Sequence, residues 1–351
     1  IRGGSWWGPL HSFLAGTVLL AISGASQMFT ITWSASPAPR SWFAGLQRWL
    51  VAGGVAGVLV GVTTTTPWLS WVGAVSVAGG LITLAISIVS AVRRSLLRRF
   101  DLSARFYLLA FAAGIVGVTL GAIIGSGTTG QAFRTIRLVH SHLNLLGLVG
   151  FTIIGTIPTF LPTVAHHRAV SGIEAKLAWW LCAGGSALLT SGLALPPAVV
   201  GLGTMLIGLA GAMVLGGVLA RLWSKGRQRL SFLQIGAGVT WLIAWALVDG
   251  ANLLSGGAQT PFNPWTAAAV VAGVGQVLLG SLAYLLPVLL GRSNDGRKDR
   301  GRRWPAIPLA LANLAGLALA AGFSLIAITS SALWLADFVL RLLRPASRDK
   351  G

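Results

Sequence analysis

Apolar stretches of about the length that crosses a bilayer follow one another along the whole chain. A transmembrane α-helix needs roughly 20 predominantly apolar residues. A further apolar stretch, 327–343, follows the last clear one without a breaker, so we expect eleven spans, or ten if this stretch does not cross. The ten others are predicted at 10–32, 47–64, 68–92, 105–126, 138–164, 175–194, 197–223, 231–254, 265–290 and 305–326.

The composition agrees with this pattern and excludes a water-soluble globular domain. Hydrophobic residues make up 54% of the chain, charged residues only 9%, and the mean hydropathy is +0.78. Soluble domains carry far more charge than this. We therefore predict an all-α fold, a polytopic transmembrane helical bundle that forms a single transmembrane domain over 1–351.

Basic residues predict the orientation in the membrane, because positively charged loops stay in the cytoplasm. They cluster after odd-numbered spans, which places the start of the first span outside. Arg134 and Arg137 are the exception. The chain opens at Ile1 without Met or a signal-peptide pattern, and one further helix upstream would give twelve spans. The cytoplasmic clusters are Arg93, Arg94, Arg98 and Arg99; Arg168 and Lys176; Arg221, Lys225, Arg227 and Arg229; residues 297–303; and the tail residues Arg341, Arg344, Arg348 and Lys350.

The net charge of +19 raises the question of a nucleic-acid partner. The charges are scattered through short loops between spans, however, which favours contact with anionic lipid headgroups. We expect the lipid bilayer as partner, no nucleic acid, and a multi-pass location in a bacterial cell membrane. Cys182 is the only cysteine, so no disulfide can form within the chain, and we expect it to be a packing residue.

Three of the predicted helices share a register. Subtracting 131 from the residue numbers of the span 138–164 places His142 on His11 and Gly155 on Gly24. Subtracting 125 from those of the span 265–290 places Gly280 on Gly155. This predicts a threefold repeat of four-helix units, approximately 10–126, 138–254 and 265–343. In the third unit the positions of His140 and His142 hold Trp265 and Ala267. Glycines at four-residue spacing, such as Gly117, Gly121 and Gly125, indicate close helix packing.

Histidines are the candidate chemical groups. His140 and His142 lie at the mouth of the apolar run 143–164, in a chain with five histidines. Ionisable groups at bilayer depth usually face a cavity, a partner or a cofactor. A helix turns by about 100° per residue, so the side chains of His140 and His142 point roughly 200° apart. They are therefore suited to two separate sites, or to one site and one hydrogen bond. His11, at matching depth, is the expected partner of His142; structural hydrogen bonding is the alternative for His11 and His140.

Two imidazoles from facing helices are suited to binding haem. Neutral imidazole is a standard axial ligand of haem iron, and a pair would give a bis-imidazole site. Arg137 lies one turn outward of His140, with Arg134 beyond it, where cations would meet haem propionates. The predicted site is therefore His11, His140 and His142 as metal ligands, with Arg134 and Arg137 binding the cofactor.

These residues resemble a known family. A His-x-His at the outer end of a helix, a Gly-rich apolar run and Pro162 near the inner end are similar to the haem-ligand helix of haem-copper oxidase and nitric oxide reductase catalytic subunits. His11 with Gly16 resembles the second-helix haem ligand there. The resemblance implies three four-helix units and haem, and is nearest to smaller oxidase-like and NnrS-like bacterial membrane proteins.

Two departures from that family argue against copper and proton pumping. The pair His166 and His167 begins 24 residues after His142, about 36 Å along a helix, so it cannot join an outer copper site and is expected to be solvated. Only seven acids exist; Asp249 ends span eight and Asp337 is the one intramembrane acid expected. No complete copper site and no proton-pumping oxygen reductase is predicted.

Three functions remain open at this point. The first is a haem-binding membrane protein, related to oxidase subunit I, that works with a redox partner protein in electron transfer, in nitric oxide or redox response, or in haem or copper handling. The second is a multi-span transporter or channel without haem, with its site between repeats. The third is a structural membrane subunit. A visible absorption spectrum separates the first from the others.

Overall fold

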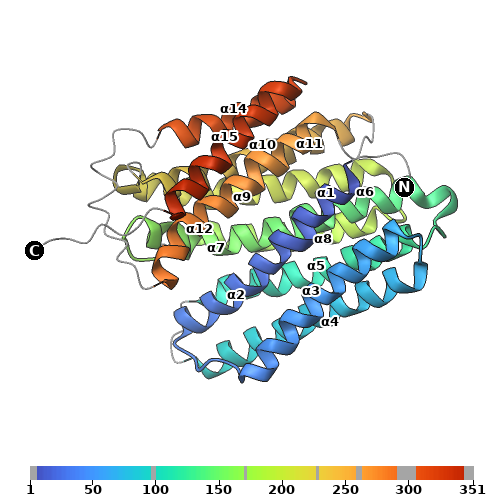
Figure 1. Ribbon diagram of the computed structural model, residues 1–351, viewed down its shortest axis with the longest axis horizontal. Coiled ribbons are helices and arrows are strands. Elements are labelled where there is room, and N and C mark those ends of the chain that lie inside the picture. Colours follow the sequence, from blue (N-terminus) through green and yellow to red (C-terminus); the bar gives the residue numbers. More distant parts are fainter. Residues whose placement is uncertain are drawn as a thin grey trace, which may run out of the picture. The chain divides into compact units, whose positions relative to one another are not determined.

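The computed structural model describes residues 6–95, 100–169, 172–226, 229–257, 263–290 and 306–343, and every regular element within them is a helix (Figure 1). In these ranges nine helices are long and apolar enough to cross a membrane. The chain is therefore an all-α, multi-pass membrane protein. The nine are Trp7–Ser34, Ser41–Thr63, Pro67–Arg94, Asp101–Gly125, Gly130–Val164, Pro197–Ser224, Leu230–Leu254, Pro264–Leu289 and Ser324–Leu343.

Two further predicted spans are helical but fall outside those nine. They are α8 (Ile173–Ser191) and the shorter α14 (Ala306–Ala320). The predicted boundary at 326–327 is wrong: α14 ends at Ala320 and α15 (Ser324–Leu343) begins four residues later. Gly322 has a φ of 82°, which glycine adopts without steric cost, and this permits the turn. The basic residues Arg98, Arg99, Arg227, Arg344, Arg348, Lys350 and the cluster 297–303 lie outside the described residues.

The chain folds into two compact units, each assembled from segments that are distant in sequence. Unit 1 comprises 1–156, 175–210 and 246–261, and unit 2 comprises 157–174, 211–245 and 262–351. In unit 1, α3 (Ser41–Thr63) packs closely along α4 (Pro67–Arg94). A Cβ at Gly54 would lie 2.7 Å from the Gly73 carbonyl oxygen, so glycine permits this approach.

Three helices contain a π-helical segment at matching positions. Subtracting 131 maps 143–149 onto 12–18, and subtracting 125 maps 269–274 onto 144–149. Such segments are rare and often mark functional sites. The segments are η1 (Ser12–Val18) between α1 (Trp7–His11) and α2 (Leu19–Ser34), η4 (Leu143–Gly150) between α6 (Phe133–His142) and α7 (Phe151–Val164), and η5 (Ala269–Val274) between α11 (Pro264–Ala268) and α12 (Gly275–Leu289).

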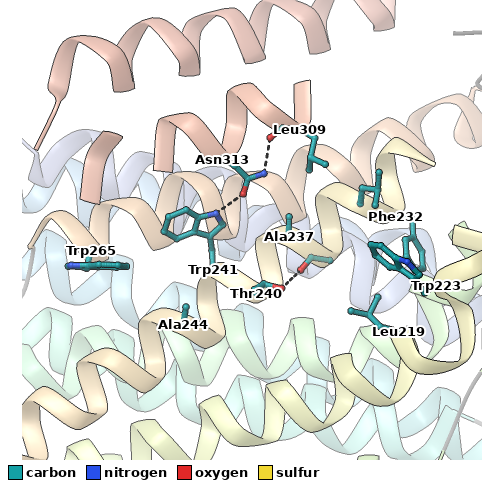
Figure 2. Close-up of a pocket in the computed structure, with 12 residues that line it drawn as sticks. Leu219, Trp223, Phe232, Ala237, Thr240, Trp241, Ala244, Trp265, Leu309 and Asn313 are labelled. Atoms are coloured by element: carbon teal, nitrogen blue, oxygen red, sulfur yellow. Dashed lines mark hydrogen bonds between the residues drawn. The ribbon is translucent and has the colours of Figure 1, made fainter. Parts of the chain in front are cut away.

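Unit 2 holds parts of α9 (Pro197–Gly226) and α10 (Leu230–Leu254) together with α11 to α15. Close approach between α10 and the next helix again depends on glycine, since a Cβ at Gly238 would lie 2.6 Å from the Gly273 carbonyl oxygen. The other face of α10 lines a pocket of about 540 Å³, drawn in Figure 2. Its lining includes residues of α9, α11 and α14.

Candidate functional site

His140 lies near the end of α6 and is held by α5 (Asp101–Gly125). Its Nδ1 lies 2.8 Å from the Gly117 carbonyl oxygen. A carbonyl oxygen can only accept, so Nδ1 carries the hydrogen and Nε2 the lone pair. A Cβ at Gly121 would lie 2.8 Å from His140 Cε1. Gly121, one of the glycines that the sequence explains as helix packing, therefore also makes room for this ring.

His11, at the end of α1, is oriented in the same way. Its Nδ1 donates to the Trp7 carbonyl oxygen one turn earlier, at 2.9 Å, so Nε2 again holds the lone pair. The imidazole stacks on the Trp7 indole, with ring centroids 4.6 Å apart and planes 25° apart. A backbone carbonyl and an aromatic ring thus both limit the rotation of the side chain.

The structure brings His11 and His140 together. Their ring centroids are 6.4 Å apart and their planes are 16° apart. Both residues are partly buried. The pair is stacked, so the ring faces are opposed, and an iron held by both residues would require the two Nε2 atoms to turn toward each other. Ligating histidines characteristically donate their other ring N–H to a carbonyl or carboxylate, as both do here.

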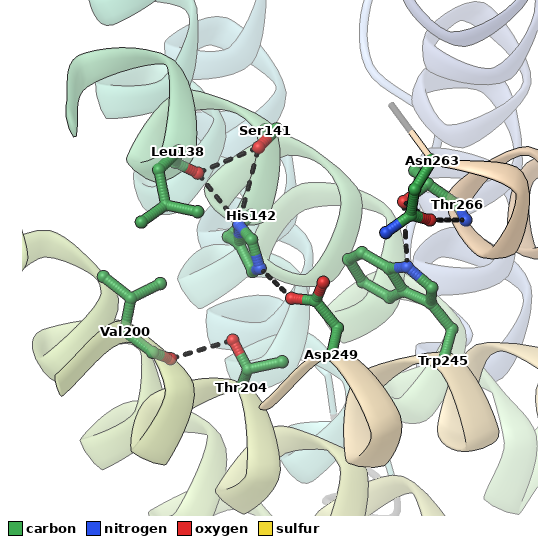
Figure 3. Close-up of polar contacts among 9 residues, drawn as sticks. All are labelled: Leu138, Ser141, His142, Val200, Thr204, Trp245, Asp249, Asn263 and Thr266. Carbon is green, nitrogen blue, oxygen red and sulfur yellow. Dashed lines mark hydrogen bonds and ion pairs between the residues drawn. The ribbon is translucent and has the colours of Figure 1, made fainter. Parts of the chain in front are cut away.

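His142 points elsewhere and is fully engaged, as Figure 3 shows. Its Nδ1 donates to the Leu138 carbonyl oxygen at 2.9 Å, and its Nε2 lies 2.8 Å from Asp249 Oδ2. The residue is 4% exposed. The predicted pairing of His11 with His142 is therefore replaced by a pairing of His11 with His140. His140 and His142 are two residues apart on one helix and therefore point in different directions, so only His140 faces His11 on α1.

Asp249, which the sequence placed at the outer end of a span, forms a buried pair with His142. Asp337 was the intramembrane acid expected from the sequence. In the structure Asp337 binds Arg341 one turn later, with nitrogen–oxygen distances of 2.5 and 3.1 Å, whereas Asp249 binds a buried imidazole. A signal was present, since Asp249 is the only acid in the apolar stretch 231–254.

The remaining predicted residues lie at the ends of helices. Arg137 places its guanidinium carbon 4.9 Å from the Phe133 ring centroid, and Arg134 is exposed. In the described part of the chain, neither forms an ion pair with a carboxylate. His166 and His167 are exposed in the turn after α7, which confirms the solvated pair, and Cys182 is buried, which confirms a packing residue.

No protein-family model matches this chain, and no curated protein matches it. Among the described residues no group of three or more His, Cys, Asp or Glu side chains is placed to hold a metal ion. The facing pair His11 and His140 can supply two nitrogen ligands. That arrangement is suited to a cofactor that brings its own equatorial ligands, such as haem.

Proposed function

We propose that this chain is a haem-binding integral membrane protein of a bacterial cell membrane, in which His11 and His140 would hold the haem iron. The 6.4 Å separation of their nearly parallel rings supports this most directly. Iron–nitrogen bonds of about 2.0 Å to both residues would require their Nε2 atoms to turn toward each other from this stacked arrangement. Each ring also has its Nδ1 anchored on a backbone carbonyl, which leaves Nε2 for the metal.

The neighbouring residues have separate tasks in this proposal. The carbonyl groups of Trp7 and Gly117 hold the ring orientations, and Gly121 provides the space for His140. Arg134 and Arg137 are available to neutralise carboxylates of the cofactor. A haem with two protein ligands supplies one-electron transfer when bound. Electron transfer with a redox partner protein is therefore favoured over binding of a small molecule at iron, and no copper site is proposed.

The visible spectrum of the purified protein tests the proposal. We expect a low-spin, bis-imidazole Soret band that is lost in His11→Ala and in His140→Ala. His166→Ala, which removes an exposed histidine, is the matched control and should keep the band. A purified, folded protein without a Soret band after growth with excess haem would contradict the proposal.

We also propose the threefold repeat, with eleven crossings in this chain. The three π-helical segments coincide in the two registers found from the sequence. Two of the three related glycines have related surroundings as well: a Cβ at Gly155 would collide with Phe106 Cβ on α5, and one at Gly280 would lie 3.0 Å from Gln234 Cβ on α10. A Cβ at Gly24, the third, would meet no described atom within 4 Å. Labelling single cysteines placed at Arg94 and Arg134 tests the topology, because they should react from opposite faces.

The His142–Asp249 pair favours a second candidate, a transporter without haem. Paired ionisable side chains inside a membrane commonly mark a solute or ion pathway. The pair joins α6 to α10 within unit 1. The absorption spectrum separates the two candidates, because the transporter has no reason to bind haem through His11 and His140.

A further inference from the structure

The pocket of unit 2 is not part of the histidine site. It measures about 540 Å³ and lies between α9, α10 and α14, with aromatic side chains at both of its ends (Figure 2). Its wall includes Gly236, where a Cβ would meet no described atom within 4 Å. No side chain of the described protein fills the space beside this glycine. Its aromatic lining consists of Trp223, Phe232, Trp241 and Trp265.

Three polar side chains in the wall are already bonded within the protein. The Trp241 indole N–H donates to Asn313 Oδ1 at 2.8 Å, and Asn313 Nδ2 donates to the Leu309 carbonyl oxygen at 2.8 Å. Thr240 donates its hydroxyl to the Gly236 carbonyl oxygen at 2.9 Å. These groups do not require a polar ligand, so the surface that they leave suits a hydrocarbon chain.

The length of the pocket matches one leaflet of a bilayer. Its lining on α10 extends from Phe232 to Ala244. Twelve residues of α-helix span about 18 Å, and half of a hydrocarbon core of about 30 Å is about 15 Å. A single acyl chain that enters from one membrane surface would therefore occupy the pocket over most of its length.

One end of the pocket lies beside basic residues near the end of α9 and just before α10. Trp223 follows Arg221 by two residues, and Phe232 follows Arg229 by three. Arg221 is hydrogen-bonded to Glu174, and among the described residues no carboxylate forms an ion pair with Arg229. This leaves an excess of positive charge, and basic pockets between membrane helices attract anionic lipid headgroups. Tryptophan is also favoured at headgroup depth.

We propose that this pocket binds one acyl chain of an anionic phospholipid whose headgroup lies beside Arg229, at the start of α10. The pocket supplies the apolar contact and Arg229 supplies the preference for negative charge. This site is independent of the proposed haem ligands, because all of its lining residues belong to unit 2.

Native mass spectrometry of the delipidated full chain tests the proposal, with dioleoyl phosphatidylglycerol and dioleoyl phosphatidylcholine added separately. We expect preferential retention of phosphatidylglycerol. Gly236→Phe places a ring in the pocket and should weaken retention about tenfold, the loss expected when a few methylene groups leave an apolar site. Gly216→Phe on α9 is the matched control, because a Cβ there also meets no described atom within 4 Å.

The charge contribution is tested separately. Arg229→Gln should lower the affinity for phosphatidylglycerol about fivefold, while Arg94→Gln, an exposed cation at the end of α4, should not. Equal retention of the two lipids by the unmodified protein would overturn the anionic headgroup. Equal retention by the Gly236→Phe and Gly216→Phe variants would overturn the pocket. Neither result bears on the absorption spectrum.

Discussion

His140 and Trp265 occupy the same position in two helices that a shift of 125 residues superimposes in sequence. Each lies shortly before a π-helical segment. His140 is anchored on the carbonyl of Gly117 and faces a second imidazole, whereas Trp265 is 42% exposed and lines an apolar pocket. The same local backbone therefore serves two different surroundings. What differs is the side chain and the residue that faces it.

A second contrast lies within one helix. His140 has a single ring nitrogen bonded to the backbone and is partly buried, while His142 has both nitrogens bonded and is buried. Two residues of sequence separate a candidate ligand from a structural ion pair. A histidine at bilayer depth is therefore assigned by its hydrogen-bond partners rather than by its depth.

The largest effect, on the visible spectrum, is expected from replacing the equivalent residues His140 and Trp265 separately by alanine. His140→Ala should abolish the low-spin Soret band, because it removes an axial ligand, and Trp265→Ala should leave the band unchanged. Added imidazole should restore a low-spin spectrum in His140→Ala by entering the space that the side chain vacates. Loss of the band in both variants would show that the two helices do not differ in the way proposed here.

Asp249→Ala should destabilise the protein by about 3 kcal/mol, because it leaves the imidazole of His142 buried without its partner. Thermal unfolding in detergent measures this change. Replacing His142 and Asp249 together by leucine should restore part of the stability, since a buried ion pair often exchanges for apolar packing at little cost. An unchanged unfolding temperature in Asp249→Ala would contradict a structural role for the pair.

Gly121→Ala should cost about 1–3 kcal/mol, because its Cβ would lie 2.8 Å from His140 Cε1 and the ring must move. We also expect a shifted Soret maximum. Gly236→Ala, on the open face of α10, is the matched case and should be neutral or stabilising by up to about 1 kcal/mol, the helix-propensity difference. Equal stability and unchanged spectra in both variants would remove the positioning role of Gly121.

The smallest effect on stability is expected at the more exposed ion pair between Arg221 and Glu174. The hydrogen bond from Arg221 lowers the pKa of the Glu174 carboxyl. Folding lowers the pKa of the Glu174 carboxyl. The ion pair with Arg221 therefore stabilises the folded protein at pH values above the pKa of Glu174 in the unfolded chain, and this stabilisation is lost as the pH falls through the lower pKa of the folded state. Glu174→Gln should change stability by less than about 1 kcal/mol near neutral pH. A loss as large as that in Asp249→Ala would show that exposure does not distinguish the pairs.

The sequence by itself determined the helical, multi-span architecture and the approximate ends of most helices. Long apolar runs must form helices in a membrane because every backbone polar group needs an internal partner there. The break between α14 and α15 was misplaced because Gly322, one glycine among 47, carries no distinguishing local pattern. The sequence also singled out His11, His140 and His142, since ionisable residues are rare in such runs.

Only the tertiary structure decided which of these histidines meet. Helix periodicity shows that His140 and His142 point in different directions, but not which direction faces α1 or α10. That choice depends on the packing of α5 against α6, where Gly121 leaves room for the imidazole of His140 and the Gly117 carbonyl oxygen accepts its hydrogen bond. The partnership of His142 with Asp249 joins residues 107 positions apart. Partnerships of that sequence separation follow from helix packing and leave no periodic signal along the chain.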